Sequence, residues 1–182
     1  MSTTGGGRVF APGIVAAFAI AAVFSPAGAV ERRAPASPPR TSERKESSMT
    51  KHAAGPFDVK VAPQTPAWEK DAGPGRMSID KRFHGDLEAK SRGEMLSVMG
   101  TVPGSAGYVA IERVTGVLGG RRGSFALQHS GSMDRGKPAL SITVIPDSGT
   151  DELAGLTGRM TIDVRPDGKH FYAFEYEVPE ER

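Results

Sequence analysis

Two alternating runs and the turn between them decide the fold: residues 160–178 read MTIDVRPDGKHFYAFEYEV. Apolar residues alternate with polar ones in 160–164, and in 170–178 every second residue from His170 to Val178 lines one largely apolar face. Alternation with a period of two is typical of a β-strand with one buried face. The Pro-Asp-Gly sequence at 166–168 favours a tight turn between the two runs. The stretch therefore predicts a β-hairpin.

The same period extends outward from this hairpin through most of the chain after Met49. It predicts six further strands, at residues 57–61, 77–88, 95–101, 108–118, 123–130 and 139–145. Turn sequences rich in Gly, Pro, Asp and Ser separate several of them, at 91–93, 119–120, 134–136 and 146–149. Residues 151–156 are the one short helical candidate. Eight evenly spaced strands predict an all-β fold, either a sandwich or, as we prefer, a single closed antiparallel eight-stranded barrel without exposed edges.

The composition limits the function classes that are open. The chain has no Cys, which excludes disulfides and thiol chemistry. Residues 1–48 hold six of the 23 Lys and Arg residues and three of the 21 Asp and Glu residues, so the remainder carries a net charge of −1. We therefore expect no nucleic-acid partner, because such a partner requires clustered basic residues. The sequence contains no cofactor signature, and none is expected.

The first 54 residues differ in character from the rest. Residues 1–29 resemble a secretory signal peptide: a charged start, an apolar stretch and a small-residue ending at Ala27-Gly28-Ala29. We expect residues 30–54 to form a disordered linker, because much of this segment is rich in Pro, Ser and charged residues. The barrel domain is expected to cover residues 55–180. Translation from Met1 predicts a secreted or periplasmic protein, whereas a start at Met49 predicts a cytoplasmic one. We expect no membrane association beyond the signal-like segment.

Three runs of residues carry a family resemblance: KRFHGDLEAKSRGEML (81–96), GSAGYVAIERVTGVLGGRRGSFALQHSG (104–131) and IPDSGTDELAGLTGRM (145–160). They resemble a bacterial family of proteins of unknown function whose barrel is similar to that of allene oxide cyclase. The resemblance implies an eight-stranded barrel and self-association as a homo-oligomer. It implies no activity, and no catalytic motif of allene oxide cyclase matches this sequence.

Several polar residues fall at positions that alternation assigns to the barrel interior, where an unpaired polar group is costly. The candidate ligand-binding residues are Lys81, Tyr108, Glu112, His129, His170 and Tyr172. As a functional site, all of them except Tyr108 would form a polar cluster at one end of the interior, with Glu112 as the candidate catalytic acid or base. As a purely structural feature, Lys81 and Glu112 would form a buried ion pair. No metal site is expected, because the histidines lack metal-ligand spacing.

Three functions remain open from the sequence. The first is a barrel that binds a small apolar or amphipathic molecule. The second is a cofactor-free isomerase or lyase that uses Glu112. The third is a structural homo-oligomer whose interior is packed solid.

Overall fold

A computed structural model describes residues 49–65 and 73–180. The predicted signal segment (1–29) and residues 30–48 of the predicted linker lie outside this part of the chain. The first strand begins at Lys51, so the last four residues assigned to the linker belong to the barrel wall.

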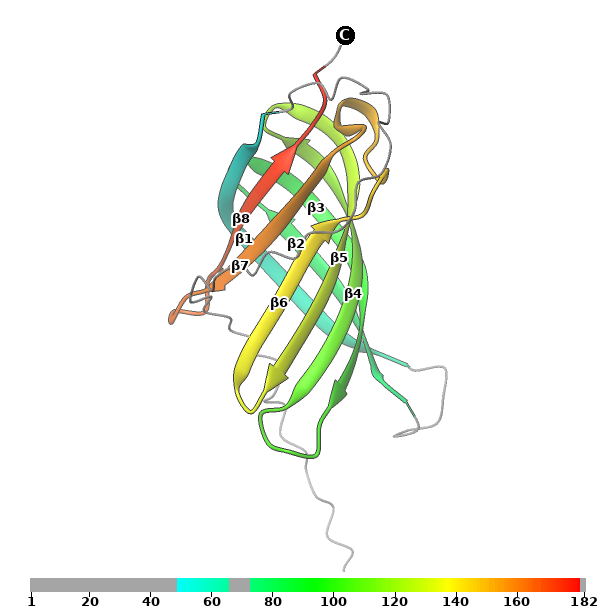
Figure 1. The fold of residues 1–182 in the computed structure, drawn as a ribbon, viewed down its shortest axis with the longest axis vertical. Coiled ribbons are helices and arrows are strands. Elements are labelled where there is room, and N and C mark those ends of the chain that lie inside the picture. The colour runs from blue at the N-terminus through cyan, green and yellow to red at the C-terminus, as the bar shows by residue number, and fades with distance from the viewer. Residues whose placement is uncertain (1–48, 66–72, 181–182) are drawn as a thin grey trace, which may run out of the picture.

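Eight antiparallel strands close into one barrel in sequence order, with β8 returning to pair with β1 (Figure 1). The all-β, eight-stranded barrel predicted from alternation is therefore confirmed. The elements are β1 (Lys51–Gln64), β2 (Gly75–Phe83), β3 (Leu87–Met99), β4 (Ala106–Leu118), β5 (Arg121–Asp134), β6 (Lys137–Val144), the 3-10 helix η1 (Asp151–Leu153), β7 (Thr157–Val164) and β8 (His170–Glu177). No helix of the described residues is long and apolar enough to span a membrane.

One predicted turn is wrong. The chain reverses at residues 84–86 instead of 91–93, so β2 ends at Phe83 and β3 begins at Leu87. Gly85 takes φ +90°, a conformation that glycine adopts without strain. Phe83 and Leu87 both face inward, one on each side of the turn. Because exactly three residues separate them, the alternation continues across the turn and hides it.

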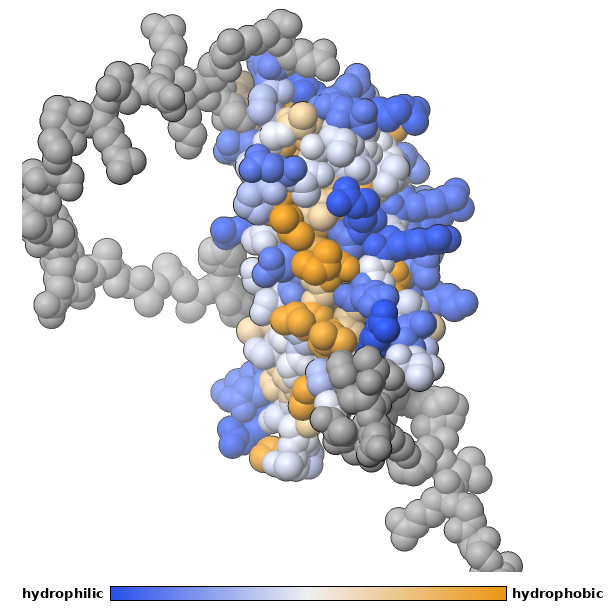
Figure 2. Space-filling model, turned by 90° about the vertical axis from the view of Figure 1, so that its right-hand side faces the viewer, coloured by the Kyte–Doolittle hydropathy of each residue, from blue (hydrophilic) through white to orange (hydrophobic). Residues whose placement is uncertain are grey.

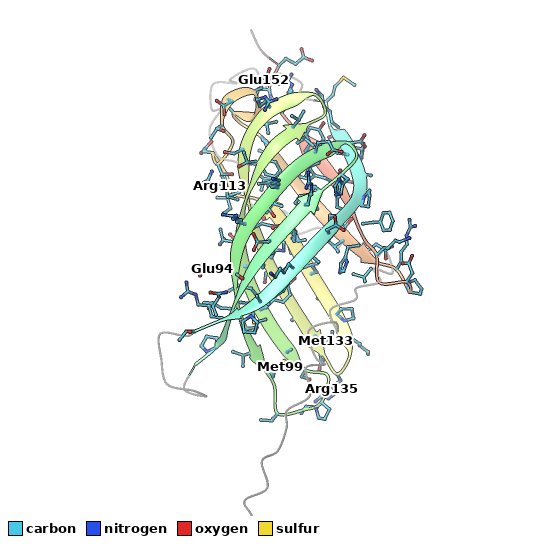
Figure 3. All side chains as sticks on the ribbon, turned by 180° about the vertical axis from the view of Figure 1, so that it is seen from behind. Glu94, Met99, Arg113, Met133, Arg135 and Glu152 are labelled. Atoms are coloured by element: carbon cyan, nitrogen blue, oxygen red, sulfur yellow. The ribbon has the colours of Figure 1, made fainter. Side chains whose placement is uncertain are left out.

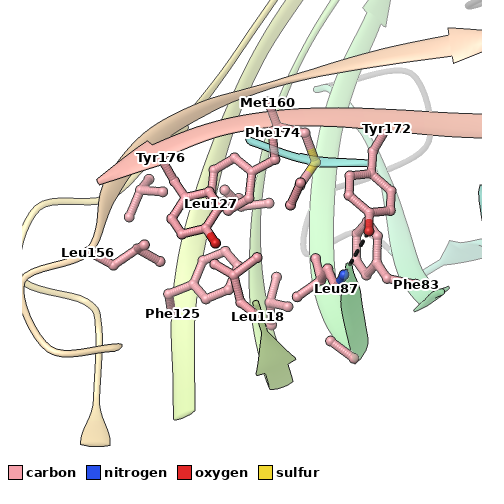
Figure 4. Packing of buried hydrophobic residues seen from close by; sticks show 14 of the residues in the cluster. Phe83, Leu87, Leu118, Phe125, Leu127, Leu156, Met160, Tyr172, Phe174 and Tyr176 are labelled. Atoms are coloured by element: carbon pink, nitrogen blue, oxygen red, sulfur yellow. Dashed lines mark hydrogen bonds between the residues drawn. The ribbon is translucent and has the colours of Figure 1, made fainter. Parts of the chain in front are cut away.

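One half of the barrel is densely packed, and we call it the closed half. Its core holds Phe83, Leu87, Leu118, Phe125 and Phe174, all almost fully buried (Figure 4). Beside these, Leu153 of η1 and Leu156 just beyond it are also buried and close this end of the barrel. Aromatic rings stack across the interior, with the Phe125 and Phe174 centroids 5.7 Å apart. Side chains therefore fill this half.

The other half of the barrel, which we call the open half, is less complete. β8 pairs with β1 only as far as Phe57, and β6 pairs with β7 only at Ile142 and Thr143. Among the described residues, 58–64 of β1 pair with β2 alone, and 137–141 of β6 pair with β5 alone. Met99 and Met133 lie near this end of the molecule, remote from Glu152 (Figure 3).

Candidate functional site

Four polar side chains from four neighbouring strands meet inside the barrel: Lys81 of β2, Ser91 of β3, Glu112 of β4 and His129 of β5. We call them the buried cluster. Strand alternation turns each of them inward. Glu112 has no exposed surface, and the most exposed member, Lys81, is only 8% accessible. The cluster thus lies in the low-dielectric interior of the protein.

Glu112 is the centre of the cluster and accepts every hydrogen bond in it. The Lys81 ammonium lies 2.7 Å from Oε1, and Nε2 of His129 lies 2.9 Å from the same oxygen. The Ser91 hydroxyl donates to Oε2 over 2.7 Å. Such short contacts are typical of charge-assisted hydrogen bonds. Both carboxylate oxygens therefore have partners, as a buried charge requires.

The surroundings of Glu112 act on its pKa in opposite directions. Burial alone would raise it, because a low dielectric disfavours the charged form. The charge of Lys81 and the hydrogen bond and charge of His129 act in the opposite direction. Together they outweigh the effect of burial, and the pKa of Glu112 falls to about 2. Glu112 is therefore ionised at any physiological pH.

A glycine makes room for the Glu112 side chain. Gly93 of β3 stands directly opposite Glu112 in the strand pairing. A Cβ atom on Gly93 would overlap the carbonyl oxygen of Ile111 and lie 2.6 Å from Cβ of Glu112. Any other residue at this position would push β4 away from β3.

Tyr108 belongs to the open half and lies four residues before Glu112 on β4. Its ring occupies the space beside Gly131, where a Cβ atom would overlap it. Burial raises the pKa of the Tyr108 phenol to about 12, and the negative charge of Glu112 contributes to the same shift. The phenol therefore remains protonated beside the cluster.

Two of the predicted site residues lie elsewhere. The Tyr172 hydroxyl accepts a hydrogen bond from the Leu87 amide (2.8 Å) and donates one to the His84 carbonyl (3.0 Å), so it fixes the turn between β2 and β3 (Figure 4). The His170 ring packs against Phe57, with centroids 5.2 Å apart. The structure thus brings together Lys81, Glu112 and His129 of the predicted cluster and leaves the other two out of it.

Ser91 was missed by the sequence analysis because residues 91–93 were assigned to a turn. Counting alternate residues from Leu87 would have placed Ser91 inward, beside Lys81, which is its partner in the strand pairing. Among the described residues, no group of three or more His, Asp or Glu side chains could hold a metal ion.

Comparison with known proteins identifies the family. Residues 53–176 match the family model described as "Protein of unknown function (DUF3224)". The chain belongs to the DUF3224 family. A crystal structure of a DUF3224 protein of unknown function from Shewanella oneidensis MR-1 is 48% identical in sequence, with a TM-score of 0.67, and the match covers 72% of this chain and all of that one. No curated protein matches the chain.

The DUF3224 match confirms the resemblance to a family of unknown function. Neither comparison names allene oxide cyclase, so that part of the resemblance stays a prediction. The family assigns no role to the buried cluster, and its chemistry must be argued from the geometry. A carboxylate with a pKa near 2 is a weak base, and general bases work best with a pKa near the working pH. In this DUF3224 protein, Glu112 is therefore better suited to holding charges in place than to removing protons.

Proposed function

We propose that the barrel binds a small apolar or amphipathic molecule against the inward-facing side chains of the open half. One observation carries the proposal: the apolar side chains there point inward yet are only half-buried. They are Val59, Val61, Met77, Met95, Tyr108, Met133 and Leu140. Inward-facing residues of the closed half, in contrast, are packed against one another, and of the seven only Val59 and Leu140 pack against that core.

Leaving these side chains in contact with water has a cost that a ligand would remove. Covering apolar surface contributes about 25 cal/mol per Å². Three of the residues are methionines, and Met adapts its shape to different partners because its side chain is flexible and polarizable. An apolar ligand group fits this surface better than a charged one.

The position of the buried cluster supports an amphipathic ligand. Strand pairing places Met77, Met95, Ala110 and His129 side by side at one level of the barrel. A ligand whose apolar part covers the two methionines would therefore bring a polar end close to His129. This arrangement resembles many binding sites, in which a few fixed polar groups orient a mostly apolar ligand.

The alternatives draw less support from the same residues. A cofactor-free isomerase or lyase would need Glu112 as a base, and its lowered pKa makes it a poor one. Self-association, which the family resemblance implies, stays a prediction that concerns the outside of the barrel.

The test uses N-phenyl-1-naphthylamine, an apolar dye whose fluorescence increases on leaving water. We expect saturable binding to the full chain and at least a tenfold loss of affinity in Met95→Glu, because a carboxylate would then project into the apolar surface. The matched control is Ala139→Glu, which places the same charge on an exposed outward position of β6, away from the inner face. Circular dichroism would verify that both variants fold.

An equal response of the two variants would contradict the proposal, as would a wild-type protein that does not bind the dye. Native mass spectrometry of the protein from its own host provides a second test. A bound mass of a few hundred daltons that disappears in Met95→Glu and persists in Ala139→Glu would support the proposal.

A further inference from the structure

The outer face of β3 and β4 exposes an unusual group of large apolar side chains. Leu96, Val98, Val109 and Ile111 all point outward and are between 38% and 57% accessible. They are cross-strand or diagonal neighbours, because Leu96 pairs with Val109 and Val98 with Gly107. Figure 2 shows hydrophobic residues gathered in a strip along this side of the molecule. Contiguous patches of this kind mark interaction sites more often than isolated apolar residues do.

This face is hollowed as well as apolar. A groove of about 620 Å³ is lined by Leu96, Val109 and Ile111. An ion pair between Arg76 and Glu94 also lines it, with two hydrogen bonds of 2.9 and 2.7 Å. A convex apolar partner would fit this groove, whereas a flat surface would not fill it.

Basic side chains gather next to the groove. Lys60, Arg82, Lys90, Arg92 and Arg113 come from four successive strands and all face outward. They lie side by side in the sheet because strand pairing sets Arg82 opposite Lys90, and Arg92 opposite Arg113. We call these five residues the cationic rows. Glu94 and Arg113 mark the same outer side of the barrel in Figure 3.

The strands themselves neutralise the cationic rows only in part: Asp58 stands opposite Arg82, and Asp80 opposite both Lys60 and Arg92, which sets two carboxylates against five cations. Like charges directly opposite each other on paired strands are destabilising, and the rows contain two such pairs. Arg92 lies 3.3 Å from Asp80, but the other four cations form no ion pair with any described residue. A negatively charged partner would relieve this repulsion.

The apolar groove and the cationic rows adjoin each other on one surface. Arg113 and Ile111 occupy successive outward positions of β4, about 7 Å apart along the strand. A single partner segment can therefore contact both. We propose that this outer face binds an acidic amphipathic segment of another protein, with its apolar side in the groove and its carboxylates on the cationic rows. The proposal is independent of the ligand proposed for the inner face.

The same residues argue against other partners. The outward positions of β1–β4 carry no Phe, Tyr or Trp side chain on which nucleic-acid bases could stack. Asp58 and Asp80 interrupt the rows. A polyphosphate backbone, charged at every unit, would meet these carboxylates, whereas a peptide can place its own carboxylates opposite the cations alone. A second copy of the chain would bring another face with an excess of positive charge.

The experiment compares two synthetic peptides of about 18 residues, long enough for five helical turns. Both carry the same leucine stripe, and their polar faces consist of Glu in one and Lys in the other. By fluorescence anisotropy with the full chain, we expect the acidic peptide to bind at least tenfold more tightly. The double variants Arg92→Glu/Arg113→Glu and Val109→Ser/Ile111→Ser should each weaken its binding at least tenfold. Arg159→Glu, at an exposed outward position of β7, is the control and should leave binding unchanged.

Equal binding of both peptides would overturn the proposal, as would full binding by either double variant. So would preferential binding to oligothymidine or to vesicles of phosphatidylcholine and phosphatidylglycerol, which would assign the face to nucleic acid or to a membrane. A dimer of the free protein that dissociates in Val109→Ser/Ile111→Ser would assign it to a second copy.

Discussion

Replacing Glu112 by Gln tests the electrostatics of the buried cluster with almost no change of shape. The amide oxygen can still accept a hydrogen bond, and the Ser91 hydroxyl can rotate to accept one from the new NH₂ group. The negative charge is lost, however. Lys81 would then retain a buried ammonium whose ion partner among the described residues, Glu112, is gone. The ammonium would keep its cation–π contacts with the Phe57 and Phe83 rings, whose centroids lie 5.5 and 5.8 Å from Nζ.

The expected loss of stability is large. Removing one partner of a buried ion pair typically costs 3–5 kcal/mol, because the other charge remains desolvated. In a domain of this size, each 1 kcal/mol lowers Tm by about 4 °C. We therefore expect Glu112→Gln to melt about 12–20 °C below the wild type.

The assay is a double-mutant cycle, followed by thermal and urea denaturation with circular dichroism. Lys81→Met removes the buried cation and keeps an apolar stem of similar length. The double variant Lys81→Met/Glu112→Gln should be more stable than Glu112→Gln alone, because no unpaired charge remains in the interior. Glu94→Gln, at the exposed ion pair with Arg76, is the control and should leave Tm nearly unchanged.

Two results would refute this reasoning. One is a Glu112→Gln protein that melts within a few degrees of the wild type. The other is strict additivity in the cycle, since additivity would mean that Lys81 and Glu112 do not stabilise each other despite the 2.7 Å contact.

Three further predictions concern the same part of the barrel. Because the folded-state pKa of Glu112 is lowered from 4.5 to about 2, the unfolded chain binds more protons in this range. Stability is therefore complete above about pH 5 and falls by about 3 kcal/mol as the pH approaches 2; urea denaturation should show this loss in the wild type and a smaller one in Glu112→Gln. Tyr172→Phe leaves the buried Leu87 amide without its acceptor, so we expect a loss of about 1–3 kcal/mol in urea denaturation, and an unchanged midpoint would contradict that role. Gly93→Ala should cost about 1–3 kcal/mol or more by overpacking against Glu112, whereas Gly107→Ala, whose nearest neighbour lies 3.9 Å away, is the control that should melt like the wild type.

Much of the fold could be predicted because alternation is a local property. The strands at 108–118 and 170–178 lie within two residues of the observed β4 and β8. The turn at 84–86 could not be found in this way, because a turn of three residues keeps Phe83 and Leu87 on the same face. Contacts between residues distant in the chain reveal it, such as the hydrogen bonds to β1 from the His84 amide to Pro56 and from the Asp86 amide to Ala54.

The candidate site was predictable only in part. Alternation correctly turned Lys81, Glu112 and His129 inward, but every inward residue satisfies the same rule, including His170 and Tyr172. The register between neighbouring strands decides which of these side chains contact one another. No local sequence pattern encodes that register. The cationic rows show the same limit, since Arg92 and Arg113 are far apart in sequence and adjacent in the sheet.

The sequence by itself determined most of the strands, most of their inward and outward faces and the family, because each depends on neighbouring residues or on a recognisable run of them. Tertiary structure alone decided the register. Register placed one carboxylate against a lysine, a serine and a histidine, left the inner face of one half of the barrel incompletely buried, and joined separated cations into a surface. The physical reason is that strand pairing fixes distances between residues remote in the chain, whereas alternation fixes only the side of the sheet on which each residue lies.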